Sequence, residues 1–348
     1  MCCWCCCLEC IHNIPPLNLL FLHFSDSAHP GEQDSAASGS ASMASISVPN
    51  PVPSAAEDAE NIRKAVQGWG TDEKALIEIL GHRTAAQRAE IAVAYEGLYN
   101  ETLLERLHSE LSSHFRSAMM LWATDPAARD AKLAHKALKK KGDRNVWVLI
   151  EVACASSPDH LVAIRKAYCA AYDSSLEEDF LVRLVTSFRY SGEFVDDEVS
   201  RAEAAELHDA VVAKKQPLHD DVVRIVSSRS KAQLKATFER YKQEHGKAID
   251  EVLEERRSSD QLAAMLKTAV WCLATPEKHF AEVIRSSIVG LGTDEESLTR
   301  AIVSRAEVDM KKVKEEYRTM YRKTVSDDVI DDTSGYYKDI LLTLVGPE

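Results

Sequence analysis

The sequence predicts an all-α protein made of four repeats of about 70 residues each. From residue 55 onward it is rich in Ala, Leu, Glu, Lys and Arg, the residue types that favour helix. Apolar residues recur there every three or four positions, which is the periodicity of an amphipathic helix. One arginine-to-tyrosine spacing also returns along the chain at a nearly constant interval, which indicates internal repetition.

The repeats are marked by a residue that ends an apolar helix and by a tyrosine twelve residues later. The pairs are Arg83 and Tyr95, Ser156 and Tyr168, Arg229 and Tyr241, and Arg305 and Tyr317. Successive pairs lie 73, 73 and 76 residues apart. The predicted repeats therefore cover residues 55–126, 127–200, 201–275 and 276–348.

Within each repeat the periodicity predicts several short helices. In the first repeat the apolar segments are Ala75–Leu80, Gln87–Tyr95, Leu103–Leu111 and Phe115–Trp122. Pro126, Pro158 and Pro276 each follow a residue that is typical of a loop or a helix start. After residues 176–179 the second repeat lacks roughly ten residues relative to the first, so we expect it to be shortened.

Residues 1–54 are predicted to form an N-terminal extension that is disordered or non-native. Ser, Ala, Gly and Asp dominate residues 25–47, a composition that does not support a packed core. Six of the nine cysteines lie in the first ten residues, and palmitoylation and metal binding both stay open for this cluster, which lacks the paired spacing of a structural zinc site. Met43 offers an alternative start that would remove this cluster. The remaining cysteines are scattered, so we expect the body to be cytoplasmic and reduced.

The net charge of −13 limits the partners of the chain. A protein this acidic repels nucleic acid and anionic lipid unless a cation intervenes. The sequence has no basic stripe with interleaved aromatic residues, and no apolar run reaches the roughly 18 residues that span a bilayer. We therefore expect no nucleic-acid partner and no transmembrane segment.

Two glycine loops carry the strongest functional signal. Residues 68–73 read Gly-Trp-Gly-Thr-Asp-Glu, and residues 290–295 read Gly-Leu-Gly-Thr-Asp-Glu. In both repeats an acid follows the first glycine by 42 positions, Glu110 in the first and Asp332 in the fourth. One Gly-x-Gly-Thr is more often a plain helix entrance, but two copies in one register with matched acids favour a shared function.

The loops and their acids favour calcium binding. Calcium takes roughly six to eight oxygen ligands, and glycines at alternate positions let a tight loop aim several backbone carbonyls at one point. We expect Thr71 and Thr293 to cap the helices that follow the loops. One carboxylate leaves the cation under-neutralised, so a lipid phosphate can complete its coordination. Without lipid, we expect a dissociation constant of about 10⁻⁴–10⁻³ M.

The repeats, the loops and their acids resemble those of annexins. The phrases Val-Pro-Ser-Ala-Ala-Glu-Asp at 52–58 and Pro-Glu-Lys-His-Phe at 276–280 resemble the plant branch of that family. The resemblance begins at about Met43, reaches the C-terminus, and implies a curved disc of four repeats. It also implies Ca²⁺-dependent binding of acidic phospholipid membranes by the convex face of a cytoplasmic protein, which is peripheral at membranes when calcium is raised.

The resemblance implies one set of calcium ligands in each glycine loop. The matching groups are the carbonyls of Val66, Gly68 and Gly70 with the Glu110 carboxylate, and the carbonyls of Ile288, Gly290 and Gly292 with the Asp332 carboxylate. At 141–144 and 214–217 the middle repeats carry cations and a proline instead of the glycine turn, so we predict no such site there. Trp69 and Leu291 stand between the glycines, where we expect them to contact the membrane interface.

Other interpretations stay open. A calcium-independent helical scaffold for protein partners would show the same periodicity. We expect no enzyme, since His82 is a lone helix-end histidine and the Asp-x-x-Gly string at 332–335 lacks a phosphate loop. Arg224–Ile225 matches a patch proposed to bind actin in the family, but two residues on an amphipathic helix do not establish that partner.

The resemblance also gives two predictions about the body. Annexins usually carry arginine where this chain has Ser156, near the polar centre of the disc. Its loss predicts a missing buried charge partner and argues against channel-like activity. Cys154 and Cys272 resemble cysteines linked to redox sensing in plant annexins, but helical cysteines more often pack in a core, and we expect packing.

Overall fold

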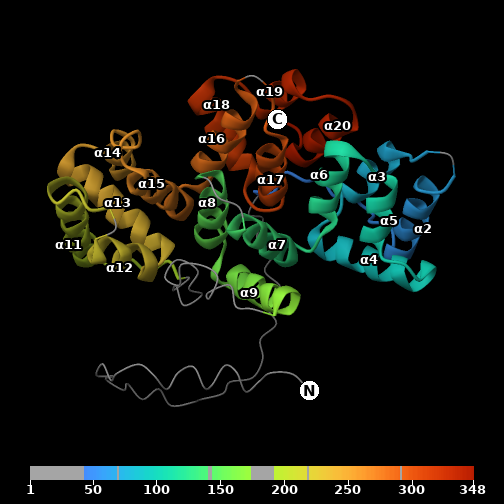
Figure 1. Cartoon of the computed structure of the whole chain (residues 1–348), viewed down its shortest axis with the longest axis horizontal. Helices are drawn as coiled ribbons and strands as arrows, with labels where there is room; N and C mark the ends of the chain where they lie inside the picture. Colours follow the sequence, from blue (N-terminus) through green and yellow to red (C-terminus); the bar gives the residue numbers. More distant parts are fainter. Residues whose placement is uncertain (1–42, 69, 140–142, 174–191, 218, 291) are drawn as a thin grey trace, which may run out of the picture. The chain divides into compact units, whose positions relative to one another are not determined.

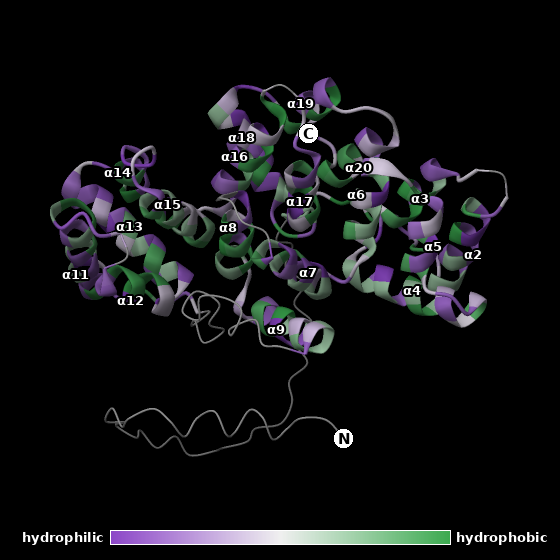
Figure 2. Cartoon of the chain, in the orientation of Figure 1, coloured by the Kyte–Doolittle hydropathy of each residue, from purple (hydrophilic) through white to green (hydrophobic). Residues whose placement is uncertain are grey.

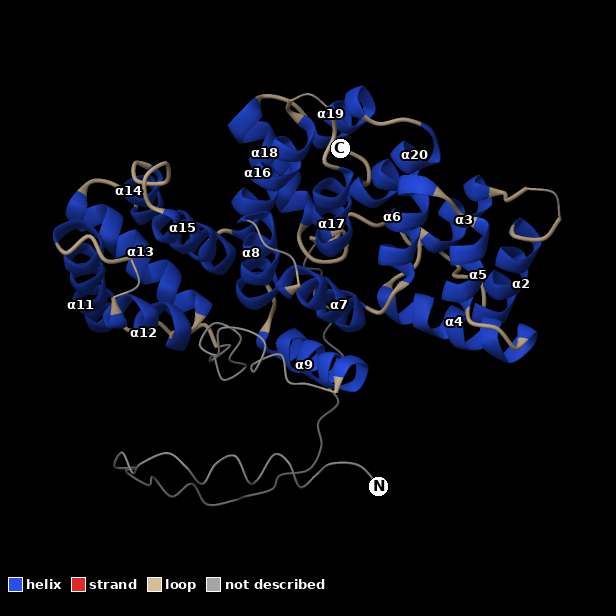
Figure 3. Cartoon of the chain, viewed as in Figure 1, coloured by secondary structure: helices blue, strands red, loops and turns tan. Residues whose placement is uncertain are grey.

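The computed structural model describes residues 43–348 except 69, 140–142, 174–191, 218 and 291. Within these residues the secondary structure is helical, with connecting loops and no β-strand (Figure 3). This confirms the all-α prediction. The expected shortening of the second repeat falls largely on residues 174–191, outside the described residues, and stays a prediction there.

The first and fourth repeats have the same order of five helices (Figure 1). In the first repeat these are α2 (Ala55–Ala65), α3 (Glu73–Leu80), α4 (Ala85–Tyr99), α5 (Leu103–Glu110) and α6 (Ser113–Ala123). In the fourth they are α16 (Pro276–Ile288), α17 (Glu295–Arg305), α18 (Met310–Tyr321), α19 (Val325–Asp332) and α20 (Gly335–Val345). Each glycine loop thus connects the first helix of its repeat to the second.

The second and third repeats differ from the first and fourth because each of them contains a π-helical turn. The second repeat has α7 (Pro126–Leu138), α8 (Asp143–Ile150), the π-helical η1 (Glu151–Ala155) and α9 (Pro158–Tyr172). The third has α11 (Asp197–His208), η2 (Asp209–Ala213), α12 (Asp220–Ser228), α13 (Lys231–His245), α14 (Ile249–Glu254) and α15 (Gln261–Ala274). The helix α11 begins at Asp197, four residues before the predicted boundary at 201, and the repeat boundaries stay a prediction.

The helix starts follow the local sequence. Pro126, Pro158 and Pro276 each occupy the first turn, where the missing N–H costs nothing. At the start of α4, the Thr84 hydroxyl accepts from the Gln87 N–H at 3.3 Å and the Gln87 side chain accepts from the Thr84 N–H at 2.9 Å. This reciprocal cap satisfies two N–H groups that have no partner inside the helix.

Two hydrophobic clusters hold the repeats together in pairs. One contains the buried residues of the first and fourth repeats, and the other those of the second and third. In the first pair α17 and α20 pack on α6, and in the second pair α15 packs on α8 and η1. Figure 2 shows hydrophobic and hydrophilic residues alternating along the helices, as amphipathic helices require.

The tyrosines that mark the sequence repeat are fully buried. Tyr95, Tyr168, Tyr241 and Tyr317 all have 0% exposure. Each hydroxyl has a partner in its own repeat: Arg63, His135, His208 and Asp328 respectively. A tyrosine stabilises a core through its large apolar surface, provided its O–H has a hydrogen-bond partner. The tyrosine that marks the sequence repeat is therefore a core residue in all four repeats.

Residues 43–54, which the sequence assigned to the extension, contact the fourth repeat. The Ser45 N–H donates to the Ala306 carbonyl at 2.8 Å, and the Ser45 hydroxyl donates to the carbonyls of Ala306 and Leu344. The Lys311 N–H donates to the Met43 carbonyl at 3.2 Å. These bonds join the segment before α2 to helices near the end of the chain.

The arginines of the register form ion pairs, and those of Arg83 and Arg305 are buried. Arg83 donates twice to Asp58 on α2, at 2.6 and 2.9 Å. Arg229 donates to Glu203 on α11 at 2.8 Å. Arg305 departs from this pattern and pairs with Asp309 at 2.7 and 2.6 Å, because Phe280 stands at the register position of the acid in the fourth repeat.

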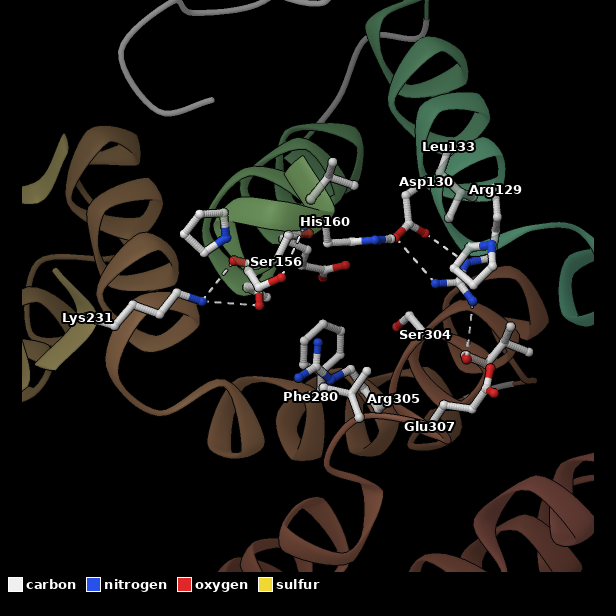
Figure 4. A pocket seen from close by; sticks show the side chains of 18 of the residues that line it. Arg129, Asp130, Leu133, Ser156, His160, Lys231, Phe280, Ser304, Arg305 and Glu307 are labelled. Carbon is white, nitrogen blue, oxygen red and sulfur yellow. Dashed lines mark hydrogen bonds and ion pairs between the residues drawn. The ribbon is translucent and has the colours of Figure 1, made fainter. Parts of the chain in front are cut away.

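In the second repeat Ser156 replaces the arginine, and Asp130 stands at the position of the acid. The structure corrects the expectation of a missing charge partner. The Arg129 guanidinium donates to Asp130 at 2.7 and 3.3 Å, and His160 Nε2 lies 2.8 Å from the same carboxylate (Figure 4). These charges lower the pKa of Asp130 against the effect of its burial. Ser156 lines a cavity of about 500 Å³ beside this cluster, and Lys231 donates to its carbonyl at 3.0 Å.

Candidate metal sites

The two glycine loops have the same backbone conformation. Gly68 and Gly70 have φ values of 110° and 88°, and Gly290 and Gly292 have 140° and 85°. A Cβ atom added to any of the four would meet nothing within 4 Å. Glycine is therefore needed because the backbone is left-handed, and not because a side chain would clash. This agrees with a loop that points several carbonyls to one side.

One backbone hydrogen bond closes each loop. The Asp72 N–H donates to the Ala65 carbonyl at 2.8 Å, and the Asp294 N–H donates to the Ser287 carbonyl at 2.7 Å. Asp72 and Asp294 also cap α3 and α17 through their side chains, at 3.0 Å from the Ala75 N and 3.2 Å from the Ser297 N. The same turn therefore leads into the second helix of both repeats.

The prediction that Thr71 and Thr293 cap these helices is wrong. The aspartates take that position, and the threonine hydroxyls contact the distant acids. Thr71 Oγ1 lies 3.5 Å from both the carbonyl and Oε2 of Glu110. Thr293 Oγ1 lies 3.3 Å from the Asp332 carbonyl and donates to its carboxylate. The sequence could not choose between threonine and aspartate, since both residue types are good caps.

The structure brings each predicted acid beside its glycine loop. Glu110 ends α5 and Asp332 ends α19, so both lie at the same position of their repeats. Val66 and Ile288 lie at the C-terminal ends of α2 and α16, where carbonyls lack partners within the helix. Trp69 and Leu291 lie outside the described residues, so their predicted membrane contact stays a prediction.

This set of groups fits calcium rather than a metal that prefers nitrogen or sulfur. Among the described residues, no three His, Cys, Asp or Glu side chains gather as a metal site. The loops offer oxygen only, from carbonyls and one carboxylate, and hard cations such as Ca²⁺ prefer such ligands. Bound calcium would add positive charge to a chain whose net charge is −13.

An arginine that sequence analysis missed contacts the first loop. Arg106 on α5 donates from Nη2 to the Val66 carbonyl at 2.8 Å, and the same nitrogen lies 3.1 Å from Glu110 Oε1. The contact between Arg106 and Glu110 could have been predicted from their spacing of four residues on one helix. The corresponding position in the fourth repeat is Asp328, so the two loops have different surroundings.

The loop of the third repeat has a different conformation. The Lys214 N–H donates to the Asp209 carbonyl at 2.8 Å, which continues the helix into the loop, and Lys215 has φ 56°. In the second repeat Arg144 donates to Asp294 at 2.5 Å, while residues 140–142 are not described. The absence of calcium from these loops stays a prediction.

The other residues singled out in the sequence have ordinary structural partners. His82 Nδ1 lies 2.7 Å from the Ser47 carbonyl. Ile225 is fully buried, which leaves Arg224 without an exposed apolar neighbour at that position for actin. Cys154 and Cys272 are buried as expected, and burial raises the pKa of the Cys272 thiol, which disfavours its nucleophilic thiolate form.

A buried polar cluster joins the second and fourth repeats. His279 on α16 donates from Nε2 to Glu151 Oε1 at 2.9 Å, and Arg300 on α17 pairs with the other oxygen of Glu151. Burial lowers the pKa of His279 to about 4 from an ordinary 6.5, and the nearby charge of Arg305 acts in the same direction. The folded protein therefore keeps this imidazole neutral.

We expect His279 to make the fold sensitive to acid. A group with a lowered pKa contributes stability above its unfolded pKa and loses that stability as the pH falls toward the folded value. Between pH 7 and pH 5 the loss should be about 2 kcal/mol. Urea unfolding at pH 7 and pH 5 measures it, and His279→Gln should lose less stability over the same interval. Equal losses in both proteins would contradict the assignment.

Comparison with known proteins agrees with this geometry. The annexin family model matches residues 57–122, 129–184, 202–267 and 279–344, and the second match is ten residues shorter than the others. Annexin D3 of Arabidopsis thaliana is 47% identical over 87% of this chain and 99% of its own length. Annexin-like protein RJ4 of Fragaria ananassa is 47% identical over 84% and 96% respectively.

Solved annexin structures have the same fold. Chicken annexin V in complex with Zn²⁺ superposes with a TM-score of 0.80 at 31% identity, covering 88% of this chain and 99% of that one. Calcium-bound annexin (Sm)1 superposes with 0.73 at 28% identity, covering 84% and 90%. No helix among the described residues is long and apolar enough to cross a membrane. The chain belongs to the annexin family.

Proposed function

We propose that this chain binds acidic phospholipid membranes when calcium is raised, through the glycine loops of the first and fourth repeats. The observation that supports this most is the repetition of one arrangement. Two loops with the same positive-φ glycines each lie beside an acid that follows 42 residues after the first glycine. Neither loop needs that acid to form its helix cap, because Asp72 and Asp294 do so.

The groups proposed to hold calcium are the same in both loops. They are the carbonyls of Val66, Gly68 and Gly70 with Glu110, and the carbonyls of Ile288, Gly290 and Gly292 with Asp332. Each set has one carboxylate, so a bound divalent cation keeps excess positive charge. That charge attracts a lipid phosphate, whereas the chain itself, with a net charge of −13, repels an anionic surface. Cytoplasmic protein would therefore reach a membrane only while calcium is raised.

A calcium titration with phosphatidylserine vesicles tests this function. We expect cosedimentation to rise with calcium, to reverse with chelator, and to disappear on phosphatidylcholine vesicles. A helical scaffold for protein partners would show no calcium dependence. Sedimentation that is equal with and without calcium would therefore favour the scaffold and contradict the proposal.

We also expect Trp69 to enter the lipid interface when calcium is bound. Its position between Gly68 and Gly70 gives an amphipathic ring at the loop, and such rings favour the headgroup region. Tryptophan emission should shift to shorter wavelength on acidic vesicles with calcium. The chain has five tryptophans, so the Trp69→Phe variant is the control and should show no shift. A shift that survives in the variant would assign the change to another tryptophan.

A further inference from the structure

In the first repeat a positive side chain already holds two of the groups proposed as calcium ligands. Arg106 Nη2 donates to the Val66 carbonyl at 2.8 Å and lies 3.1 Å from Glu110 Oε1. The two side chains are only 24% and 27% exposed, so water competes with this contact less than at an open surface. The guanidinium thus bridges the end of α2 and the end of α5.

The third repeat repeats this bridge at a loop without the glycine turn. Arg256 Nη1 donates to the Val211 carbonyl at 2.6 Å, and Nη2 lies 3.4 Å from the Lys215 carbonyl and 3.3 Å from Asp260 Oδ2. Arg256 precedes Asp260 by four residues, as Arg106 precedes Glu110. A guanidinium can therefore link the acid to the loop carbonyls on its own, where we propose no metal.

The fourth repeat lacks the bridge. Its residue at the corresponding position is Asp328, and this carboxylate accepts from Arg285, from Tyr317 and from Lys323. The acid of the loop, Asp332, accepts from Thr293 instead, and the described residues include no ion pair to it. Among the described residues no cation therefore pairs with Asp332, and the cation that contacts the fourth loop, Arg144, pairs with Asp294 instead.

We propose that Arg106 is a tethered cation that competes with calcium for the first loop, so that the fourth loop fills at lower calcium. This inference rests on the proposed function, because it assumes that both loops take calcium. A guanidinium and a calcium ion at the same carbonyl and carboxylate would repel each other at short range. Calcium must therefore displace Arg106 from Val66 and Glu110, which weakens its binding to the first loop.

Single-site variants separate the two loops. Asp332→Asn leaves the first loop as the calcium site, and Glu110→Gln leaves the fourth. Equilibrium dialysis with radioactive calcium, without lipid, then gives one dissociation constant for each loop. We expect the fourth loop to bind about tenfold more tightly, a difference of about 1.4 kcal/mol.

Removal of the guanidinium tests the cause of this difference. In the Asp332→Asn protein, adding Arg106→Gln should tighten calcium binding about tenfold. Adding Arg106→Lys should have a smaller effect, because lysine keeps the charge but not the paired donors of the guanidinium. The matched control is Arg256→Gln, which removes the same kind of bridge from the third repeat and should leave calcium binding unchanged. Thermal unfolding in chelator, measured for each variant, reports the loss of the bridge without calcium.

The outcomes distinguish this inference from the function on which it rests. Calcium binding by the Asp332→Asn protein that is unchanged or weaker after Arg106→Gln would overturn the inference alone. If neither single-site variant binds calcium, the proposed function fails as well. A gain that Arg256→Gln produces equally would also overturn the inference, since it would show a general effect of lost positive charge.

Discussion

The double variant Glu110→Gln/Asp332→Asn is expected to lose calcium-dependent cosedimentation with phosphatidylserine vesicles. Each substitution removes the one carboxylate of its loop and leaves a neutral amide of nearly the same size. The carbonyls alone offer calcium too few ligands and no negative charge. Cosedimentation across a calcium titration should fall to the level measured in chelator, while each single variant should retain binding through its other loop.

A control with the same change in net charge separates coordination from general electrostatics. Glu96→Gln/Asp331→Asn also removes two negative charges, and both residues are exposed. Glu96 lies on α4, away from the loop sequence, and Asp331 lies next to Asp332. This control should bind vesicles as the unmodified protein does. Normal binding by the Glu110/Asp332 variant would refute the assignment of these acids as ligands.

Asp58→Ala is expected to destabilise the fold by about 3–5 kcal/mol. The Asp58 and Arg83 side chains are 3% and 4% exposed, and two hydrogen bonds join them. Removal of the carboxylate leaves a charged guanidinium buried beside α2 with no opposite charge of its own. Urea unfolding at pH 7 measures the loss as a lower transition midpoint with an unchanged slope.

Glu203→Ala in the third repeat is the matched comparison and should cost less, about 1–2 kcal/mol. Its partners Arg229 and Arg224 are 37% and 44% exposed, so both guanidinium groups can return to water when the acid is lost. Glu203 Oε2 is buried and has no hydrogen-bond partner, so removing this atom breaks no hydrogen bond. Equal losses for the two variants would show that burial of the partner does not set the cost.

The helical part of the fold followed from sequence because its signals are local. The apolar periodicity and the prolines after Asp125 and Ser157 are read within a few residues of each helix. The positions of the four repeats could also be predicted from the sequence, because each repeat keeps a tyrosine that is fully buried and whose hydroxyl is hydrogen-bonded.

Side-chain contacts between residues that are distant in sequence were harder to predict from the sequence. The role of Thr71 and Thr293 is decided by acids that lie 39 residues further along, and capping preferences carry no information about them. The expected loss of a partner at Ser156 was wrong for the same reason. Asp130 is neutralised by Arg129 and His160, and no periodic pattern identifies substitutes outside the register. Arg106 was missed because an arginine four residues before an acid is common on helices.

The pairing of the first repeat with the fourth sets an order of events on the ribosome. Val66 and Leu80 belong to a cluster that is completed by residues as late as Val345. At about 5–20 residues per second, tens of seconds separate the synthesis of these two parts. The second and third repeats are neighbours in the chain and can complete their cluster first. The first repeat must meanwhile wait with one face uncovered, so nascent chains arrested before α16 should depend on chaperones more than the finished protein does.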